Sequence, residues 1–253
     1  MFYFPGSRTP SPPPGVEEVW IPGPDNAQLH AWLIRADQSS PGERRPAVLH
    51  VHGNAGTVDD HLSACEWLRR DGIHVLLFDY RGFGRSDPGS LRRAELVADT
   101  HAALDFLLNH PDVDPDRVGV YGWSLGAVIA LAVASEREEV QAVAAVSGFS
   151  SWKGIAADKV PLLGPLMIHS GYDAVDSVRN LGSRPLLLVH GDNDRIVPAH
   201  HSRRLAEAAR DAGVEVEYLT LPDAGHLDWL WVTRQGEATI RRFFREELVD
   251  SDK

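Results

Sequence analysis

The chain has 253 residues, and its hydrophobic (43%) and charged (24%) fractions are those of a soluble globular protein. Its net charge of −11 argues against nucleic acid or an anionic membrane as a partner. The single cysteine, Cys65, excludes an internal disulfide and suits a reducing compartment. No apolar run approaches the ~18 residues of a membrane-spanning helix, and no signal peptide is recognisable. The sequence therefore predicts a cytoplasmic protein.

The N-terminal third of the chain predicts an arm, a hairpin and a buried strand. Residues 1–15 are rich in proline, and we expect an extended arm there. The segments "EEVWI" and "QLHAWLIR" alternate apolar and polar residues around the turn-like "PGPDN", which predicts an antiparallel hairpin. The nearly continuous apolar run "PAVLHVHG" follows, as expected for a strand buried on both faces.

Helices and strands alternate in the remainder of the chain. Helices are predicted over residues 59–71, 93–110, 125–136, 199–212 and 229–248. Strands are predicted in "IHVLLFD", "RVGVYG", "VQAVAAVSG", "RPLLLVHG" and "VEVEYLTL". Because no linker interrupts this pattern, it predicts one α/β domain over residues 1–253, with a mostly parallel sheet of about eight strands and helices on both faces.

Residues 148–183 form the one long irregular stretch, and they are too apolar for simple disorder. We expect a small lid there. Together with Trp123, its side chains Trp152, Leu163 and Met167 are candidates for an apolar acyl pocket.

The segment "GWSLG" places Ser124 between a predicted strand and a predicted helix. A sharp turn there pushes the hydroxyl outward, and Gly122 and Gly126 supply the small neighbours that such a turn requires. The helix start also offers amide groups to a developing anion. Ser124 is therefore the candidate nucleophile.

A serine hydroxyl becomes a good nucleophile only when a base accepts its proton. Candidates for this base and for the acid that supports it follow two further predicted strands. The loop after "VEVEYLTL" carries His226, the candidate general base. The strand "RPLLLVHG" is followed by Asp192 and Asp194, of which Asp194 is the preferred acid and Asp192 the reserve. All three positions lie at the carboxyl end of a strand, where sites form in α/β sheets.

The oxyanion of the reaction needs two amide donors. The residue after the nucleophile, Leu125, is expected to supply one of them. The loop "HGNAG" is expected to supply the other from Asn54, with Ala55 in reserve, because Gly53 lets the backbone approach closely.

Five segments together resemble the small serine hydrolases of the α/β-hydrolase superfamily. These are "HGNAG" (52–56), "DYRGFGRS" (79–86), "GWSLG" (122–126), "HGDNDRIVP" (190–198) and "AGH" (224–226). The resemblance covers nearly the whole chain and implies the triad Ser124, Asp194 and His226, since the family's acid stands three residues before Val-Pro. It also implies that "DYRGFGRS" is a landmark beside the site and not itself catalytic.

Two departures from the resemblance stand out. Many relatives carry a membrane helix before a "YFP"-like segment, whereas "FYFP" begins here at residue 2. Relatives often read Gly-His-Asn-Asp, whereas this chain has Leu227 after His226. Because the superfamily includes carboxylesterases, acylglycerol lipases, thioesterases and some peptidases, the resemblance implies acyl-bond hydrolysis without naming a substrate.

Metal-dependent chemistry is the first alternative. His50 and His52 form an H-x-H pair, but "GNAGTV" separates them from the run ending in His61, whereas a metallo-β-lactamase-like site needs H-x-H-x-D-H. His200 and His201, at a predicted helix start, are expected at the surface. No metal and no other cofactor is expected.

We therefore expect a carboxylesterase-like serine hydrolase that cleaves esters or thioesters of small to medium acyl groups through an acyl-enzyme. A small aminopeptidase or amidase with the same triad stays open, as does a hydrolase-fold protein that only binds. The expected partner is a small acyl ester, without nucleic acid or an integral membrane segment. The sequence does not indicate an oligomeric state.

Overall fold

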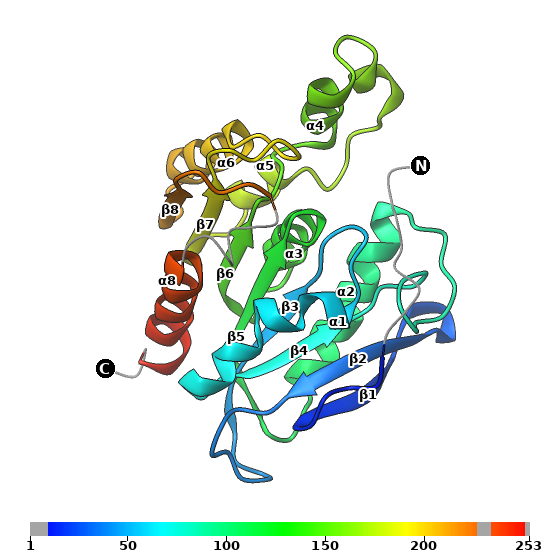
Figure 1. Ribbon diagram of the computed structural model, residues 1–253, viewed down its shortest axis with the longest axis vertical. Helices are drawn as coiled ribbons and strands as arrows, with labels where there is room; N and C mark the ends of the chain where they lie inside the picture. The colour runs from blue at the N-terminus through cyan, green and yellow to red at the C-terminus, as the bar shows by residue number, and fades with distance from the viewer. Residues whose placement is uncertain (1–9, 227–233, 251–253) are drawn as a thin grey trace.

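A computed structural model describes residues 10–226 and 234–250. Its eight strands form one sheet in the order β1-β2-β4-β3-β5-β6-β7-β8 (Figure 1). The strands are β1 (Val16–Pro22), β2 (Gln28–Ile34), β3 (Arg45–Val51), β4 (His74–Phe78), β5 (Val113–Trp123), β6 (Val140–Val146), β7 (Leu186–Gly191) and β8 (Val216–Leu221). The pairs β1–β2 and β2–β4 are antiparallel, and all other neighbours are parallel. The predicted hairpin and mostly parallel sheet are confirmed.

Helices cover both faces of the sheet, as predicted. The α-helices are α1 (Val58–His61), α2 (Arg93–Leu108), α3 (Leu125–Glu136), α4 (Trp152–Lys159), α5 (Ala174–Arg179), α6 (His200–Asp211) and α8 (Arg234–Phe244). On one face, α2, α3, α5 and α6 bury side chains such as Leu104, Val128 and Leu205. On the other, the segment after β3 and α8 bury Trp67 and Phe244. The apolar strands are thus enclosed on both sides.

The predicted helix over residues 59–71 is not continuous. The structure has only one α-helical turn there, α1, followed by the 3₁₀ segments η2 (Leu62–Ala64) and η3 (Glu66–Asp71). The capping box of Thr57 and Asp60 starts α1, and Cys65 interrupts the segment with a φ of −145°. Short 3₁₀ pieces are the result.

The final helix also differs in detail from its prediction. It runs from Arg234 to Phe244 and continues as a π-helical turn, η5 (Arg245–Val249). The first five residues of the predicted helix, 229–233, lie outside the described residues, as do residues 1–9 of the predicted arm. No helix in the described parts of the chain combines the length and hydropathy needed to cross a bilayer.

The predicted lid segment, 148–183, divides into two parts. Helix α4 and the 3₁₀ turn η4 (Gly164–Met167) project from the body beyond α6, as Figure 1 shows in green. Helix α5 instead buries Ala174, Val175 and Val178 in the core beside α3 and α6. Only the part before α5 therefore projects from the body of the protein (Figure 1).

Candidate active site

Ser124 lies on a strained turn between β5 and α3. Its backbone has φ 57° and ψ −114°, a conformation that costs a non-glycine residue free energy. The flanking glycines are required by close packing. A Cβ on Gly122 would lie 2.3 Å from the carbonyl oxygen of Gly126, and one on Gly126 would lie 1.9 Å from that of Val51. The turn predicted from "GWSLG" is therefore built as the sequence indicates.

Three predicted site residues meet at the carboxyl ends of the strands. His226 Nε2 lies 3.0 Å from Ser124 Oγ, and His226 Nδ1 lies 2.7 Å from Asp194 Oδ2. Ser124 follows β5, Asp194 follows β7, and His226 follows β8, so parallel strands bring them to one edge. The arrangement allows the histidine to accept the serine proton while the aspartate holds the other ring nitrogen.

Asp194 is held as a carboxylate by four hydrogen-bonding groups. Its Oδ1 accepts the backbone N–H groups of Ile196 (2.9 Å) and Val197 (2.8 Å). Its Oδ2 contacts His226 and lies 3.2 Å from Nε2 of His190. Burial by itself would raise the pKa of Asp194, but the hydrogen bonds from His190, His226 and Val197 outweigh it, so the pKa lies well below its ordinary value.

Asp192, the reserve candidate for the triad acid, contacts the backbone of Asp223, whereas Asp194 contacts His226. Asp192 Oδ1 accepts the backbone N–H of Asp223 at 2.7 Å, so it links the loops after β7 and β8. The geometry therefore favours Asp194 over Asp192 as the partner of His226. Residue Leu227, where the chain departs from the relatives' pattern, lies outside the described residues.

The loop between β3 and α1 lies against the serine turn. A Cβ on Gly53 would be 3.2 Å from the carbonyl oxygen of Trp123, a tight contact next to Ser124, so the glycine eases this close approach. The expected amide donors Asn54 and Leu125 both line the same cavity as Ser124, and so does the reserve Ala55. Ala55 has a φ of 66°, which bends the loop sharply after Asn54.

Two histidines hold the backbone of Gly53. The Gly53 N–H donates to Nε2 of His61 at 3.3 Å, and Nδ1 of His52 donates to the Gly53 carbonyl oxygen at 2.7 Å. Because His61 Nε2 is an acceptor, its ring proton is on Nδ1, which lies 3.1 Å from Nε2 of His50. His50, His52 and His61, considered above as possible metal ligands, instead form a cluster in which His52 and His61 contact Gly53 and His50 contacts His61.

These three histidines are buried and uncharged. Burial, reinforced by the nearby His52, lowers the pKa of His50 to about 3. Burial is also the main cause that lowers the pKa of His52 and His61. Cys65, another buried group, has a pKa raised well above its usual range by burial, so its thiol is not a nucleophile at neutral pH.

The segment "DYRGFGRS" contacts the elements next to the site through its first residue, Asp79. Asp79 Oδ1 accepts the N–H of Val58 at 2.9 Å, and its Oδ2 lies 3.0 Å from Nδ1 of His30. A Cβ on Gly84 would lie 1.9 Å from the Asp79 carboxylate, which explains the glycine. Asp79 thus ties the first turn of α1 to β2 and β4.

A cavity of about 490 Å³ opens above Ser124. Its apolar wall is made by Trp123, Leu125, Phe149, Trp152, Ile155, Ala156, Ile168, Ile196 and Val197. Lys159, exposed at the end of α4, is the charged side chain among the lining residues. The cavity therefore suits an apolar group bound next to the serine.

The predicted pocket residues divide into two pairs. Trp123 and Trp152 line the cavity, whereas Leu163 and Met167 do not and are 61% and 75% exposed. The prediction is corrected there because the chain doubles back at η4, where a Cβ on Gly164 would lie 2.2 Å from the Ala156 carbonyl oxygen. Phe149 also lines the cavity and was not predicted, although its place shortly after the end of β6 was a usable signal.

The prolyl oligopeptidase family, Peptidase_S9, matches residues 60–249, which is more than half of the chain. The chain belongs to this family. It is therefore a serine hydrolase of the α/β-hydrolase superfamily, as the resemblance of its motifs implied. YfhR of Escherichia coli strain K12, an uncharacterized relative, is 32% identical over 253 residues, covering 99% of this chain and 85% of YfhR.

Two solved structures illustrate the range of proteins that share this fold. The esterase Pf2001 of Pyrococcus furiosus superposes with a TM-score of 0.80 at 21% identity and covers 98% of this chain and 99% of its own. An acylaminoacyl peptidase of Pyrococcus horikoshii gives a TM-score of 0.75 at 19% identity and covers 92% of this chain but 41% of the peptidase. At these identities the likeness concerns the fold alone.

Proposed function

We propose that this protein hydrolyses carboxylic esters, or thioesters, of small to medium acyl chains through an acyl-enzyme. One observation carries the proposal: the Ser124 hydroxyl lies 3.0 Å from His226 Nε2 and opens into an apolar cavity of about 490 Å³. A nucleophile, its base and room for an acyl chain thus occur together.

In acylation, Ser124 Oγ bonds to the substrate carbonyl carbon while His226 Nε2 accepts the hydroxyl proton. Asp194, 2.7 Å from Nδ1, keeps the ring in the reactive tautomer and then stabilises the imidazolium. The carbonyl oxygen becomes an oxyanion, for which the amides of Leu125 and Asn54 are the proposed donors. Losing one such donor typically costs about 3–4 kcal/mol of transition-state stabilisation.

The tetrahedral intermediate then collapses and releases the alcohol or thiol. His226 returns its proton to the leaving oxygen or sulfur, so the acyl group remains bonded to Ser124. In deacylation, a water molecule attacks the acyl carbon while the same imidazole accepts its proton. The proton goes back to Ser124 as the carboxylic acid leaves, and the enzyme is restored.

The cavity supports an acyl substrate over a peptide with a free amine. An aminopeptidase needs an anionic group to hold the substrate ammonium, and no described residue that lines the cavity carries a carboxylate. The exposed Lys159 adds a positive charge, which disfavours a cationic substrate further. The volume of about 490 Å³ supports short to medium chains.

The test compares wild type with Ser124→Ala on p-nitrophenyl esters of increasing chain length, a thioester series and aminoacyl arylamides. We expect wild type to prefer short to medium esters, and Ser124→Ala to lose turnover by on the order of a million-fold while its unfolding midpoint stays similar. Full activity in Ser124→Ala would overturn the mechanism. A maximum at long chains would overturn the substrate class.

An amidase or aminopeptidase is the second candidate, because the prolyl oligopeptidase family match favours amide bonds. A preference for aminoacyl arylamides over every ester in the same panel would select it. A third possibility is a protein that binds without catalysis. A fluorophosphonate probe distinguishes it, since labelling at Ser124 of the folded protein requires an activated serine.

A further inference from the structure

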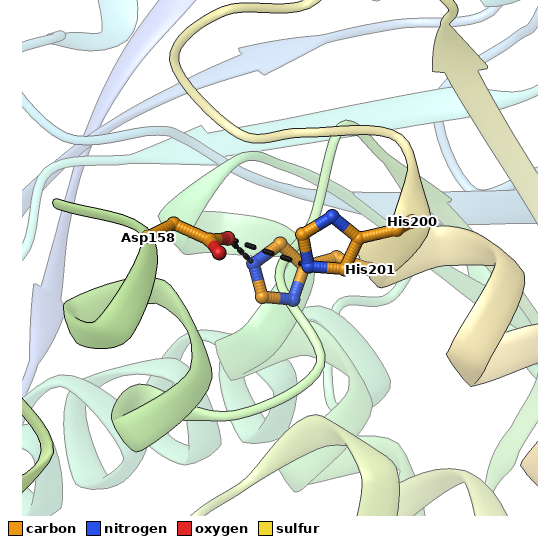
Figure 2. Close-up of side chains that lie close together, drawn as sticks. All are labelled: Asp158, His200 and His201. Carbon is orange, nitrogen blue, oxygen red and sulfur yellow. Dashed lines mark hydrogen bonds and ion pairs between the residues drawn. The ribbon is translucent and has the colours of Figure 1, made fainter. Parts of the chain in front are cut away.

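Asp158, His200 and His201 converge at the outer edge of the lid, away from the serine. Asp158 stands near the end of α4, and the two histidines open α6 (Figure 2). Asp158 Oδ2 lies 2.9 Å from Nε2 of His201 and 3.4 Å from Nε2 of His200. One ligand atom from each residue fits within 4.8 Å of the others. Two elements that are 40 residues apart in the chain thus present three ligand atoms to one point.

The histidines were expected at the surface, and this holds for only one of them. The His200 side chain is 49% exposed, whereas that of His201 is 1% exposed. The buried ring is fixed at its other end, because its Nδ1 lies 2.9 Å from Ser150 Oγ and accepts the Ser150 N–H at 3.2 Å. The contact fixes the orientation of the His201 ring, and Ser150 Oγ is a group to which an Nδ1–H can donate when Nε2 binds a metal ion.

The spacing fits a small divalent ion. Bonds of about 2.0–2.1 Å at tetrahedral angles set neighbouring ligand atoms about 3.3 Å apart. The contacts of 2.9 Å and 3.4 Å from Asp158 are close to this value, and all three ligand atoms lie within 4.8 Å of one another. Two imidazoles and one carboxylate are a ligand set that suits zinc, and the exposed side of His200 leaves room for water as a fourth ligand.

We propose that Asp158, His200 and His201 form a zinc-binding site that fastens the lid helix α4 to the start of α6. The site is separate from the hydrolytic triad and does not depend on the proposed substrate. It uses a cluster that the sequence alone did not indicate, because its members come from two distant segments.

Zinc binding at His201 needs only a shift of the ring proton from one nitrogen to the other. In the metal-free protein the proton of the His201 ring is on Nε2, since Nδ1 accepts from the Ser150 amide, and Nε2 donates to Asp158. On binding, zinc takes the Nε2 lone pair, and the ring proton moves to Nδ1, where Ser150 Oγ accepts it. The Ser150 N–H loses its acceptor, a cost that weakens the site relative to a fully preorganised one.

The consequence concerns the cavity wall. Ile155, Ala156 and Lys159 line the cavity from the same helix that carries Asp158. An ion shared between α4 and α6 therefore fixes this wall against the body of the protein. Without the ion, the two helices are joined here by the contacts between Asp158 and the two histidines.

The first test measures zinc binding to tag-free protein by isothermal titration calorimetry. We expect one zinc ion per chain in wild type, and an affinity lowered on the order of 10–100-fold in His200→Gln and in Asp158→Asn. His200 is half-exposed, so its variant keeps the fold. His169→Gln, an exposed histidine of the same lid segment, is the control and should bind like wild type. Equal affinity in all four proteins, or no binding, would overturn the site.

A second readout uses structure rather than affinity. Cobalt in place of zinc should give the intense visible bands of a tetrahedral site in wild type and not in His200→Gln. Zinc should also slow tryptic cleavage after Lys153 and Lys159 of α4 in wild type but not in His200→Gln, which controls for effects on the protease. Binding without this protection would overturn the fastening of α4.

Discussion

His61 was considered from the sequence as a possible metal ligand, but in the structure its ring accepts a backbone hydrogen bond. It lies nine residues after His52, and its ring reaches back to accept the Gly53 N–H that precedes the candidate oxyanion amide of Asn54. His50 supports the ring from below at 3.1 Å. We therefore expect His61 to act as a positioning residue for the loop that carries the proposed oxyanion donor Asn54.

We expect His61→Ala to lower kcat on p-nitrophenyl acetate by on the order of 10-fold, less than the full loss of an oxyanion donor. Without the ring, the Gly53 amide loses its acceptor and the loop becomes looser. Steady-state kinetics separate this effect from cavity size, since His61 also lines the cavity and its removal alone would change KM. His61→Gln, whose amide oxygen can accept, should recover part of kcat. An unchanged kcat in His61→Ala would contradict the assignment.

Individual site residues differed in how far the sequence predicted them. Ser124, Asp194 and His226 were predictable because each lies within a few residues of the end of a recognisable strand, and the parallel sheet brings these strand ends together. Leu163 and Met167 were not, because hydrophobicity in a lid does not say which way an irregular chain turns. The role proposed for each triad residue stays a prediction until the Ser124→Ala test.

At the level of elements, α3 and β3 approach each other closely at Gly126. A Cβ there would lie 1.9 Å from the carbonyl oxygen of Val51, which is backbone and cannot move aside cheaply. The approach brings the helix that starts after Ser124 against the strand that leads into the oxyanion loop. One glycine thus sets the distance between two parts of the site.

We expect Gly126→Ala to lower the free energy of unfolding by about 1–3 kcal/mol or more and to abolish fluorophosphonate labelling, because overpacking displaces the serine turn. Urea unfolding and probe labelling measure the two effects. Gly213→Ala is the control: its φ is 76° and no atom lies within 4 Å, so strain alone costs about 1 kcal/mol and labelling persists. Full labelling of Gly126→Ala would argue against the packing constraint.

Helix α4 supplies one wall of the cavity, and it should set the acyl-chain limit. Ile155→Trp fills space above Ser124, so we expect hydrolysis of p-nitrophenyl octanoate to fall by about 10-fold relative to the acetate, a difference of one to two kcal/mol. Leu163→Trp is the matched control, since Leu163 lies outside the cavity, and its chain-length profile should equal that of wild type. Identical profiles in both variants would place the acyl chain elsewhere.

The elements themselves were predictable to different depths. Apolar runs and helical periodicity located the strands and most helices, because a strand buried on both faces appears in the sequence as a nearly continuous apolar run. The break in residues 58–71 was not visible, since the same apolar spacing serves an α-helix and two 3₁₀ turns. The position of β4 between β2 and β3 follows from tertiary pairing rather than from local pattern.

For the whole molecule, the buried histidines make stability depend on pH. Burial lowers the pKa of His50 from an ordinary 6.5 to about 3, so between these values the unfolded chain binds a proton that the folded chain does not. The free energy of unfolding therefore falls as pH falls from about 6.5 towards 3. His52 and His61, whose pKa values are also lowered, act in the same direction.

We expect His50 alone to cost the protein about 2 kcal/mol of stability at about pH 5 relative to pH 7.5. Urea unfolding at the two pH values measures this, and in His50→Gln the difference should shrink by a similar amount. Glutamine does not titrate, yet its amide oxygen can accept from His61. An equal pH dependence in the two proteins would contradict the assignment.

The cytoplasmic location predicted from the sequence stays a prediction.

The outer strands β1 and β8 bear on how copies of this protein meet in a crowded solution. Edge strands offer amide and carbonyl groups to any extended chain, and proteins defend them with charge and proline. Here Glu17, Glu18 and Pro22 stand on β1, and Glu217 stands on β8, where Arg242 pairs with it. A second molecule that added its own β1 to this β1 would bring Glu17 and Glu18 close to their copies, so edge-to-edge extension of the sheet is opposed at β1.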